Sequence, residues 1–181
     1  QGPWLMEQMK AQAEHVGARM VSDHVTRVEL GRRPFVVHCD SGAVWTCDTL
    51  VVATGARAKW LGIASEEAFK GYGVSACATC DGFFYRGKEV IVVGGGNSAV
   101  EEALYLSHLA KKVTVVHRRD AFRSEKILQE RLFRRDNVDV IWDSAIDEIL
   151  GQQNPPGVTH VRLKNVKTGA TSERKVDGVF V

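Results

Sequence analysis

One segment constrains the fold more than any other: an apolar run that leads into three glycines and then into a helix-like pattern. Val90-Ile91-Val92-Val93 is typical of a strand, and Gly94-Gly95-Gly96-Asn97-Ser98-Ala99 follows it directly. Beyond Ala99 the apolar residues have the spacing of an amphipathic helix. A strand, a glycine turn and a helix in this order predict a βα unit of a parallel sheet.

The alternation of strand and helix continues along the chain. We expect strands at 89–93, 112–116 and 138–142 and helices at 98–110 and 124–135, the order of a parallel sheet with right-handed crossovers. Residues 158–166 and 172–181 predict a hairpin that turns at Thr168-Gly169. The expected fold class is therefore α/β, a Rossmann-like domain with a parallel sheet and an added hairpin.

The first third of the chain has a different pattern. Residues 3–16 predict an amphipathic helix that ends at Gly17. Short β-rich runs at 19–21, 25–30, 34–39 and 43–47 predict a meander of three or four strands. Leu50-Val51-Val52-Ala53 predicts a further strand, buried on both faces, before Thr54-Gly55. We place a domain junction near residue 57.

Composition excludes several classes of protein. With 44% hydrophobic residues the chain can build a core, and its formal net charge of +2 is too balanced to indicate nucleic-acid or membrane binding. No stretch approaches the ~20 continuous apolar residues of a membrane span. The chain begins with Gln1, and Val179-Phe180-Val181 resembles an unfinished strand, so we expect an internal segment of a longer protein.

The glycine turn fits the G-x-G-x-x-G/A fingerprint of dinucleotide-binding proteins. Gly94 permits the tight turn, Gly96 lets the backbone approach a pyrophosphate, and Ala99 lets helix and strand pack closely. Asn97 and Ser98 begin a helix whose free N–H groups favour phosphate. The alternative is a turn that binds nothing, which the strand–turn–helix context disfavours.

Residues after the second expected strand distinguish the two nicotinamide cofactors. An NAD site usually has Asp or Glu about 20 residues after the first glycine. This chain has His117-Arg118-Arg119-Asp120 there, with Arg123 beyond. Arginines offer several donors to a 2′-phosphate, so we infer NADPH rather than NADH. The alternative is a solvated charged loop.

A second motif, Cys77-Ala78-Thr79-Cys80-Asp81-Gly82, indicates redox chemistry. A C-x-x-C pair can close a disulfide, and Asp81 can supply or remove the proton that exchange requires. The alternatives are two structural cysteines or half a zinc site, but zinc usually needs a second close pair, so we predict no metal. We expect Cys39 and Cys47 to be small buried residues, and the aromatics at 83–85 to pack in the core.

A hydride carrier does not reduce a disulfide directly at a useful rate, and a flavin normally mediates. The two motifs together therefore imply FAD as well as NADPH, although no second nucleotide fingerprint is present in these residues.

These motifs resemble those of the bacterial low-molecular-weight thioredoxin reductases, a class of pyridine nucleotide-disulfide oxidoreductases. The resemblance rests on residues 77–85, 94–104 and 117–123, and Ser75-Ala76 and Ala53-Thr54-Gly55 also fit. It implies a cytoplasmic homodimer that reduces the disulfide of thioredoxin with NADPH and FAD. Cys80 would face the flavin, Cys77 would attack thioredoxin, and Asp81 would act as acid and base.

The resemblance also implies domain bounds. Residues 1–57 would be part of a discontinuous FAD domain, with Ala53, Thr54 and Gly55 near the flavin nucleotide and Val25 near the adenine. Residues 58–181 would be a nearly complete NADPH domain that carries the dithiol. Its NADPH residues would be Gly94, Gly96, Asn97, Ser98, Ala99, His117, Arg118, Arg119 and Arg123. Because both flanking FAD motifs are absent, we expect this segment alone to hold FAD weakly or not at all and to be incomplete for activity.

Two other functions are open at this point. The flavoprotein reductase of the alkyl hydroperoxide system shares the C-x-x-C domain, but it favours NADH and lacks the His-Arg-Arg run. A non-catalytic nucleotide-binding regulator would need no redox pair, and Cys77 and Cys80 argue against it.

Overall fold

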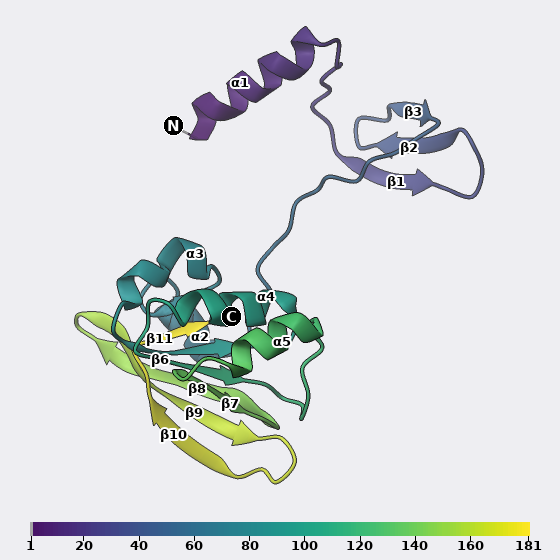
Figure 1. Cartoon of the computed structure of the whole chain (residues 1–181). Coiled ribbons are helices and arrows are strands. Elements are labelled where there is room, and N and C mark those ends of the chain that lie inside the picture. Colours follow the sequence, from purple (N-terminus) through teal and green to yellow (C-terminus); the bar gives the residue numbers. More distant parts are fainter. Residues whose placement is uncertain (1) are drawn as a thin grey trace. The chain divides into compact units, whose positions relative to one another are not determined.

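The chain divides into two units between Gly55 and Ala56 in a computed structural model that describes residues 2–181. The sequence pattern predicts the junction near residue 57. Figure 1 shows the elements of both units. None of the helices within the described range combines the length and the apolar character needed to cross a bilayer.

The first unit consists of one helix and one small sheet. Helix α1 (Gly2–His15) is followed by Gly17, whose φ of 91° permits its N–H and that of Ala18 to bond back to the last helical turn. Strands β1 (Val25–Glu29), β2 (Phe35–Cys39) and β3 (Val44–Cys47) form an antiparallel meander in the order β1-β2-β3. The expected meander is confirmed with three strands, whereas the strand expected at 19–21 is absent.

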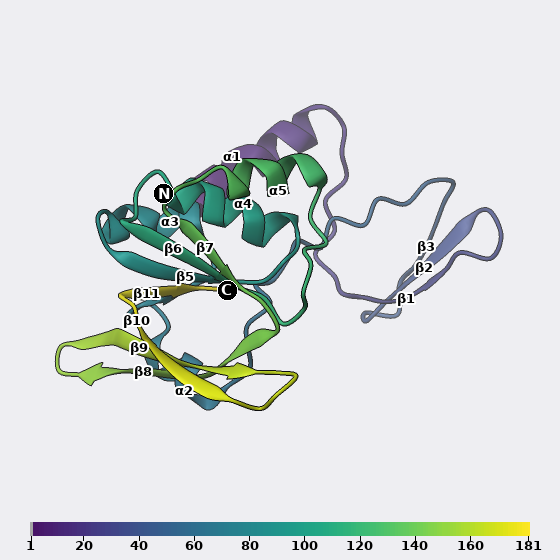
Figure 2. The ribbon, with the colours of Figure 1, turned by 60° about the horizontal axis from the view of Figure 1, so that its bottom comes forward.

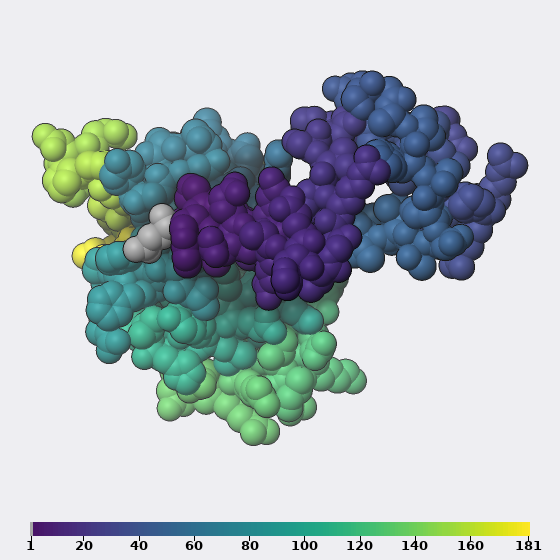
Figure 3. Space-filling model, turned by 90° about the horizontal axis from the view of Figure 1, so that it is seen from above, coloured from purple at the N-terminus to yellow at the C-terminus, as the bar shows by residue number. Residues whose placement is uncertain are grey.

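Little of this unit is buried. Among its described residues only Val37 is buried; Figure 3 draws the atoms of this unit in purple and blue. Cys39 and Cys47 are half-buried free cysteines, so the prediction that they are buried is wrong. Desolvation and the nearby Asp23 carboxylate raise the pKa of the Cys39 thiol.

The strand predicted at 50–53 is also wrong. Residues 49–63 have no regular structure, and the side chains of Val51 and Val52 are 85% and 75% exposed. An apolar run becomes a strand only where neighbouring strands bind its N–H and C=O groups. No strand within residues 2–181 pairs with this run.

The second unit is built on a parallel sheet of five strands. These are β4 (Val74–Ser75), β5 (Glu89–Val93), β6 (Lys112–Val116), β7 (Val138–Ile141) and β11 (Gly178–Phe180), in the spatial order β4-β11-β5-β6-β7. The strands expected at 89–93 and 112–116 are confirmed to the residue. The two expected helices are α4 (Asn97–Leu106) and α5 (Lys126–Phe133), both shorter than predicted.

Three shorter helical segments complete this half of the unit: α2 (Ala64–Phe69), α3 (Ala78–Asp81) and a 3₁₀ turn, η1 (Gly82–Tyr85).

A second, antiparallel sheet contains β8 (Ser144–Gln153), β9 (Pro156–Asn165) and β10 (Thr171–Lys175) in the order β10-β9-β8. The hairpin of β9 and β10 confirms the expected turn, where Gly169 has a φ of 75°. Two features differ from the prediction. Residues 144–153 form a strand, and residues 178–180 leave the hairpin to join the parallel sheet, because Val179 and Phe180 become fully buried there.

The second unit therefore has three layers (Figures 1 and 2). Helices α4 and α5 cover one face of the parallel sheet, and the antiparallel sheet covers the other. Successive strand residues alternate between two cores: Val90 and Val92 pack with Leu106 of α4, whereas Ile91 packs with Val161 of β9. This packing fixes the carboxyl edge of the parallel sheet, from which both chemical motifs extend.

Candidate functional site

The site lies where the strand order reverses. From β5 the chain proceeds to β6 and β7 on one side, and it returns on the other side of β5 as β11. In doubly wound sheets, ligands bind outside the carboxyl ends of the strands at such a reversal. Gly94 follows β5 at this point, and Cys77 follows β4 at the same edge. The fold thus brings the two predicted motifs together.

The glycine turn leaves open space at one position. Gly94 has a φ of 140°, and a Cβ on it would lie 2.8 Å from the Cβ of Ala99. A Cβ on Gly96, by contrast, would meet no heavy atom within 4 Å. Gly96 directly precedes α4, whose first-turn N–H groups have no intrahelical acceptor. The turn therefore fits a bound phosphate group, which the N–H groups and the helix dipole would stabilise.

Asn97 is exposed at the start of α4, and its side chain also makes a hydrogen bond that holds two helices together. Its Oδ1 accepts the N–H of Glu125 at 2.9 Å, which ties α4 to the residue that precedes α5. Ser98 is exposed beside it, and Ala99 is half-buried against Gly94.

His117 lies against the middle glycine of the turn, a contact that the sequence did not indicate. A Cβ on Gly95 would be 2.5 Å from Cε1 of the His117 ring. The ring is 7% exposed, packs against Phe122 and Trp142, and its Nε2 has no hydrogen-bond partner among the described residues. Burial and the nearby Arg119 guanidinium lower the pKa of His117 below 6.5, so the ring is neutral at neutral pH.

The loop that carries the three predicted arginines is bonded to this turn. The carbonyl of Gly95 accepts the N–H of Arg123 at 2.7 Å, which fastens the arginine loop to the turn. Arg118, Arg119 and Arg123 are all exposed. Within residues 2–181 none of the three side chains makes an ion pair or a side-chain hydrogen bond. Their guanidinium groups are thus available to a doubly charged phosphate.

The two cysteines of the C-x-x-C motif form a disulfide. Cys77 is half-buried and caps α3, and its Sγ accepts the backbone N–H of Cys80 at 3.2 Å. Cys80 is exposed. A donated N–H stabilises negative charge on sulfur, so when the disulfide opens this bond favours a thiolate at Cys77.

The carboxylate beside the disulfide is bound to a serine to which the sequence motifs assign no role. Asp81 is half-buried, and its Oδ2 accepts the hydroxyl of Ser75 at 2.6 Å. A second carboxylate, Glu102 of α4, accepts the N–H of Ala78 at 3.2 Å, and burial raises the pKa of Glu102. Ser75 and Glu102 both lie within the segments that carry the family resemblance, but the sequence motifs assign neither of them a role, because their contacts with the dithiol segment depend on the fold.

The aromatics after the dithiol are not all in the core. Phe83 and Phe84 are 66% and 69% exposed, so the prediction of core packing is wrong for them. Tyr85 packs against Phe180 with ring centroids 5.2 Å apart, as expected of a core residue.

The predicted flavin contacts lie in the first unit. Val25 begins β1, and Ala53, Thr54 and Gly55 belong to the segment without regular structure. All four residues are exposed. The described residues of this unit do not enclose a site for a flavin, so we derive no step through FAD from their geometry.

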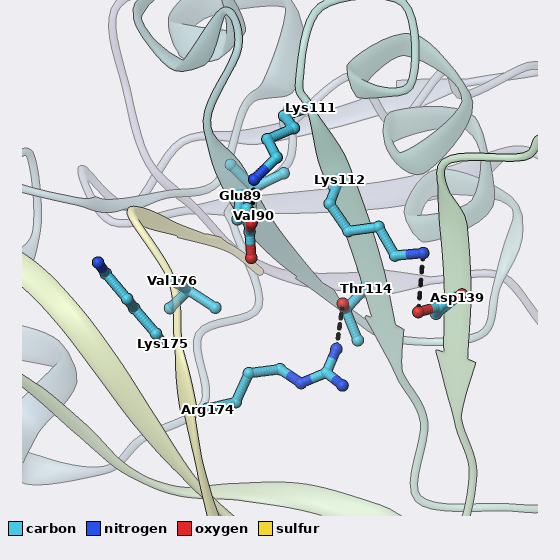
Figure 4. Close-up of a pocket in the computed structure, with 9 residues that line it drawn as sticks. All are labelled: Glu89, Val90, Lys111, Lys112, Thr114, Asp139, Arg174, Lys175 and Val176. Carbon is cyan, nitrogen blue, oxygen red and sulfur yellow. Dashed lines mark hydrogen bonds and ion pairs between the residues drawn. The ribbon is translucent and has the colours of Figure 1, made fainter.

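A pocket of about 470 Å³ lies at the opposite, amino end of β5 and β6 (Figure 4). It contains four cationic side chains, Lys111, Lys112, Arg174 and Lys175. Three of them are already paired: Lys111 with Glu89, Lys112 with Asp139, and Arg174 with the hydroxyl of Thr114. We therefore assign no ligand to it. The part of the chain that the structure describes also contains no cluster of three His, Cys, Asp or Glu residues able to hold a metal ion.

Known proteins resemble this chain over nearly its whole length. The pattern that defines the pyridine nucleotide-disulphide oxidoreductase family matches residues 5–181. The thioredoxin reductase of Rickettsia conorii is 58% identical over 181 residues, which are 100% of this chain and 58% of that protein. A Pseudomonas fluorescens protein named glucosaminate ammonia-lyase is 52% identical over 183 residues, 99% of this chain and 56% of that protein.

Solved structures show the same likeness. The thioredoxin reductase from Giardia duodenalis has a TM-score of 0.79 at 40% sequence identity, and the similarity covers 99% of this chain and 58% of that one. The chain thus spans less than two thirds of the length of each of these relatives.

Proposed function

Because the chain belongs to the pyridine nucleotide-disulphide oxidoreductase family, we propose that it is part of an NADPH-dependent thioredoxin reductase. One observation carries the proposal: the disulfide Cys77–Cys80 and an open glycine turn with unpaired arginines extend from the same edge of one sheet. We propose residues 58–181 as the NADPH domain and residues 1–57 as part of the FAD domain. The whole protein would be a cytoplasmic homodimer.

In this proposal the glycine turn holds the pyrophosphate of NADPH. Gly94, Gly96 and Ala99 shape the turn, and the N–H groups at Asn97 and Ser98 face the phosphates. Arg118, Arg119 and Arg123 bind the 2′-phosphate. His117 belongs to the same site. Its ring is buried and neutral, and it supports the glycine turn by packing against Gly95. The unpaired arginines favour NADPH, which argues against the NADH-preferring reductase of the alkyl hydroperoxide system.

FAD, when bound, converts hydride donation by NADPH into the electron pair that a disulfide accepts. Val25, Ala53, Thr54 and Gly55 are the contacts that we propose from residues 1–57. Cys80 is the cysteine that we propose to face the flavin.

The reduced dithiol would then transfer its electrons to thioredoxin. The Cys77 thiolate attacks one sulfur of the thioredoxin disulfide, a mixed disulfide forms, and the released sulfur takes a proton. Cys80 attacks the Cys77 sulfur, which closes the disulfide and releases thioredoxin with two thiols. Asp81 takes a proton from a thiol as a carboxylate and returns it to a leaving sulfur as an acid. The N–H of Cys80 stabilises the attacking Cys77 sulfur.

Cys80→Ser in the full-length protein tests this function. NADPH should still bleach the flavin absorbance, while reduction of thioredoxin should be lost. The matched control is Cys47→Ser, which replaces a free cysteine outside the site and should retain turnover. Thioredoxin reduction by the Cys80→Ser protein would contradict the proposal. So would a wild-type protein that releases ammonia from glucosaminate and leaves thioredoxin oxidised.

A further inference from the structure

Ser75 is a buried polar residue that the chemistry proposed above leaves without a role. It ends β4 and is 6% exposed. Its backbone is fixed by the parallel sheet, where it pairs with Phe180 of β11 and its carbonyl accepts the N–H of Val181 at 3.0 Å. The position of Ser75 is therefore set by the sheet and not by the loop that carries the dithiol.

The hydroxyl of Ser75 contacts both ends of the redox segment. Its Oγ donates to Oδ2 of Asp81 at 2.6 Å and accepts the N–H of Cys77 at 3.1 Å. The carbonyl oxygen of Cys77 lies 3.4 Å from the same Oγ. Among the described residues no other group bonds the Asp81 carboxylate, so a single hydroxyl ties it to the sheet.

We propose that Ser75 is a positioning residue that holds Asp81 beside the dithiol in both protonation states of the carboxyl group. The inference rests on the proposed function, because that function makes Asp81 the proton donor and acceptor. It adds a residue that acts through Asp81 without contacting the substrate.

The geometry serves both states because a hydroxyl has one hydrogen and two lone pairs. When Asp81 is a carboxylate, the Ser75 hydrogen points to Oδ2. When Asp81 carries the proton, its O–H donates to Ser75 Oγ, and the Ser75 hydrogen turns to the carbonyl of Cys77. The N–H of Cys77 keeps its acceptor in either case. Asp81 therefore gains and loses its proton without leaving its place.

Removal of the hydroxyl should release Asp81. Its half-buried carboxyl group would be free to rotate toward water, and the Cys77 N–H would lose its acceptor. A positioned acid or base contributes typically 10²–10⁴-fold to a rate. We expect loss of positioning alone to remove part of this, about tenfold.

The experiment is a double-mutant cycle in the full-length protein. Ser75→Ala, Asp81→Asn and the double variant are reduced with NADPH and mixed with thioredoxin, and oxidation of the dithiol is followed in a single turnover. Ser75→Ala should slow this step about tenfold with little change in the KM for thioredoxin, and should add no further loss to Asp81→Asn. Ser75→Thr, which keeps the hydroxyl, should recover most of the rate.

Ser107→Ala is the matched control. Ser107 is a buried serine of the same unit, and its hydroxyl donates to the carbonyl of Leu104, away from the dithiol. This variant should leave the rate unchanged. If Ser75→Ala does not fold, Ser75→Val, which has the shape of the Ser75→Thr variant without its hydroxyl, takes its place in the cycle.

Two outcomes would overturn the inference: a Ser75→Ala rate equal to wild type, or a loss that is as large in the Asp81→Asn background as in wild type. A small aromatic disulfide, used as a second substrate, separates this failure from that of the proposed function. A wild-type protein that reduces the small disulfide but not thioredoxin refutes the proposed function, and the cycle on the small disulfide still tests Ser75.

Discussion

Gly95 and Gly96 are adjacent glycines that should respond differently to the same substitution. A Cβ on Gly95 would lie 2.5, 2.6 and 2.7 Å from three atoms of the His117 ring, whereas a Cβ on Gly96 would meet nothing within 4 Å. Gly96 has φ and ψ of −91° and −179°, which any residue adopts. Gly95→Ala should therefore destabilise the fold, and Gly96→Ala should affect only the ligand.

The size of the first effect follows from packing. Ordinary contacts of a Cβ begin near 3.4 Å, so the His117 ring must move by almost 1 Å. Phe122 and Trp142 pack against the ring and oppose this movement. Overpacking of this kind costs about 1–3 kcal/mol. At roughly 3 °C per kcal/mol for a chain of this length, the Tm should fall by about 3–9 °C. Gly96→Ala should leave the Tm unchanged or raise it slightly.

Two measurements on the 181-residue chain check this pair. Thermal unfolding without nucleotide, followed by circular dichroism, gives the Tm of each variant. Titration calorimetry gives the NADPH affinity, which Gly96→Ala should reduce about tenfold or more, a loss of ~1.4 kcal/mol, because the new methyl group fills the space left for the pyrophosphate.

His117→Ala supplies the control for the contact itself. In that background Gly95→Ala should cost much less stability, since the ring that opposes the methyl group is gone. A Gly95→Ala protein that melts within about 1 °C of wild type would refute the packing argument. Full NADPH affinity in Gly96→Ala would refute the assignment of the open space to the nucleotide.

Other predictions concern charge and burial. Arg118→Ala with Arg119→Ala should weaken NADPH binding about tenfold or more while NADH binding changes little; equal losses would contradict a 2′-phosphate site. Because the pKa of His117 is lowered in the folded state, its contribution to stability is complete above pH ~6.5 and is lost as the pH falls below that value, so urea midpoints from pH 5 to 8 should show less acid sensitivity in His117→Gln. Glu66 is 2% exposed and accepts two backbone N–H groups at 2.8 and 2.9 Å, so Glu66→Gln should cost ~2 kcal/mol in denaturant unfolding, unlike the exposed Glu67→Gln.

Sequence patterns predicted the parts of the fold that neighbouring residues determine. The apolar run before Gly94 and the run 112–116 are short, β-branched and bounded by helix-like segments, and both strands match the structure. The glycine turn and the arginines follow these strands directly, so their position at the sheet edge could be inferred without coordinates. The same prediction for the apolar run at 50–53 is wrong, because a strand also requires a neighbouring strand to bind its N–H and C=O groups, and the run itself does not show whether one is present.

The contacts that complete the site could not be inferred in this way. Ser75 reaches Asp81 through the position of β4, and His117 reaches Gly95 through the pairing of β5 with β6. Neither residue belongs to a spacing pattern with its partner. The sequence pattern predicts that residues 178–180 belong to the hairpin, because they are apolar and follow β10 closely. In the structure they form β11 of the parallel sheet, because Val179 and Phe180 are buried there.

The insertion of β11 between β4 and β5 links the two motifs energetically as well as geometrically. β4 has only two residues, and β11 is its only partner strand within the described chain. The N–H groups of Val179 and Val181 hold the carbonyls of Gly73 and Ser75, while Gly178, Val179 and Phe180 pair with β5 on the other side. Ser75, and through it Asp81, is therefore placed by residues a hundred positions further along the chain. A disturbance of β11 is therefore expected to act on the strand before the dithiol and on the strand before the glycine turn together, although the two motifs are separate in the sequence.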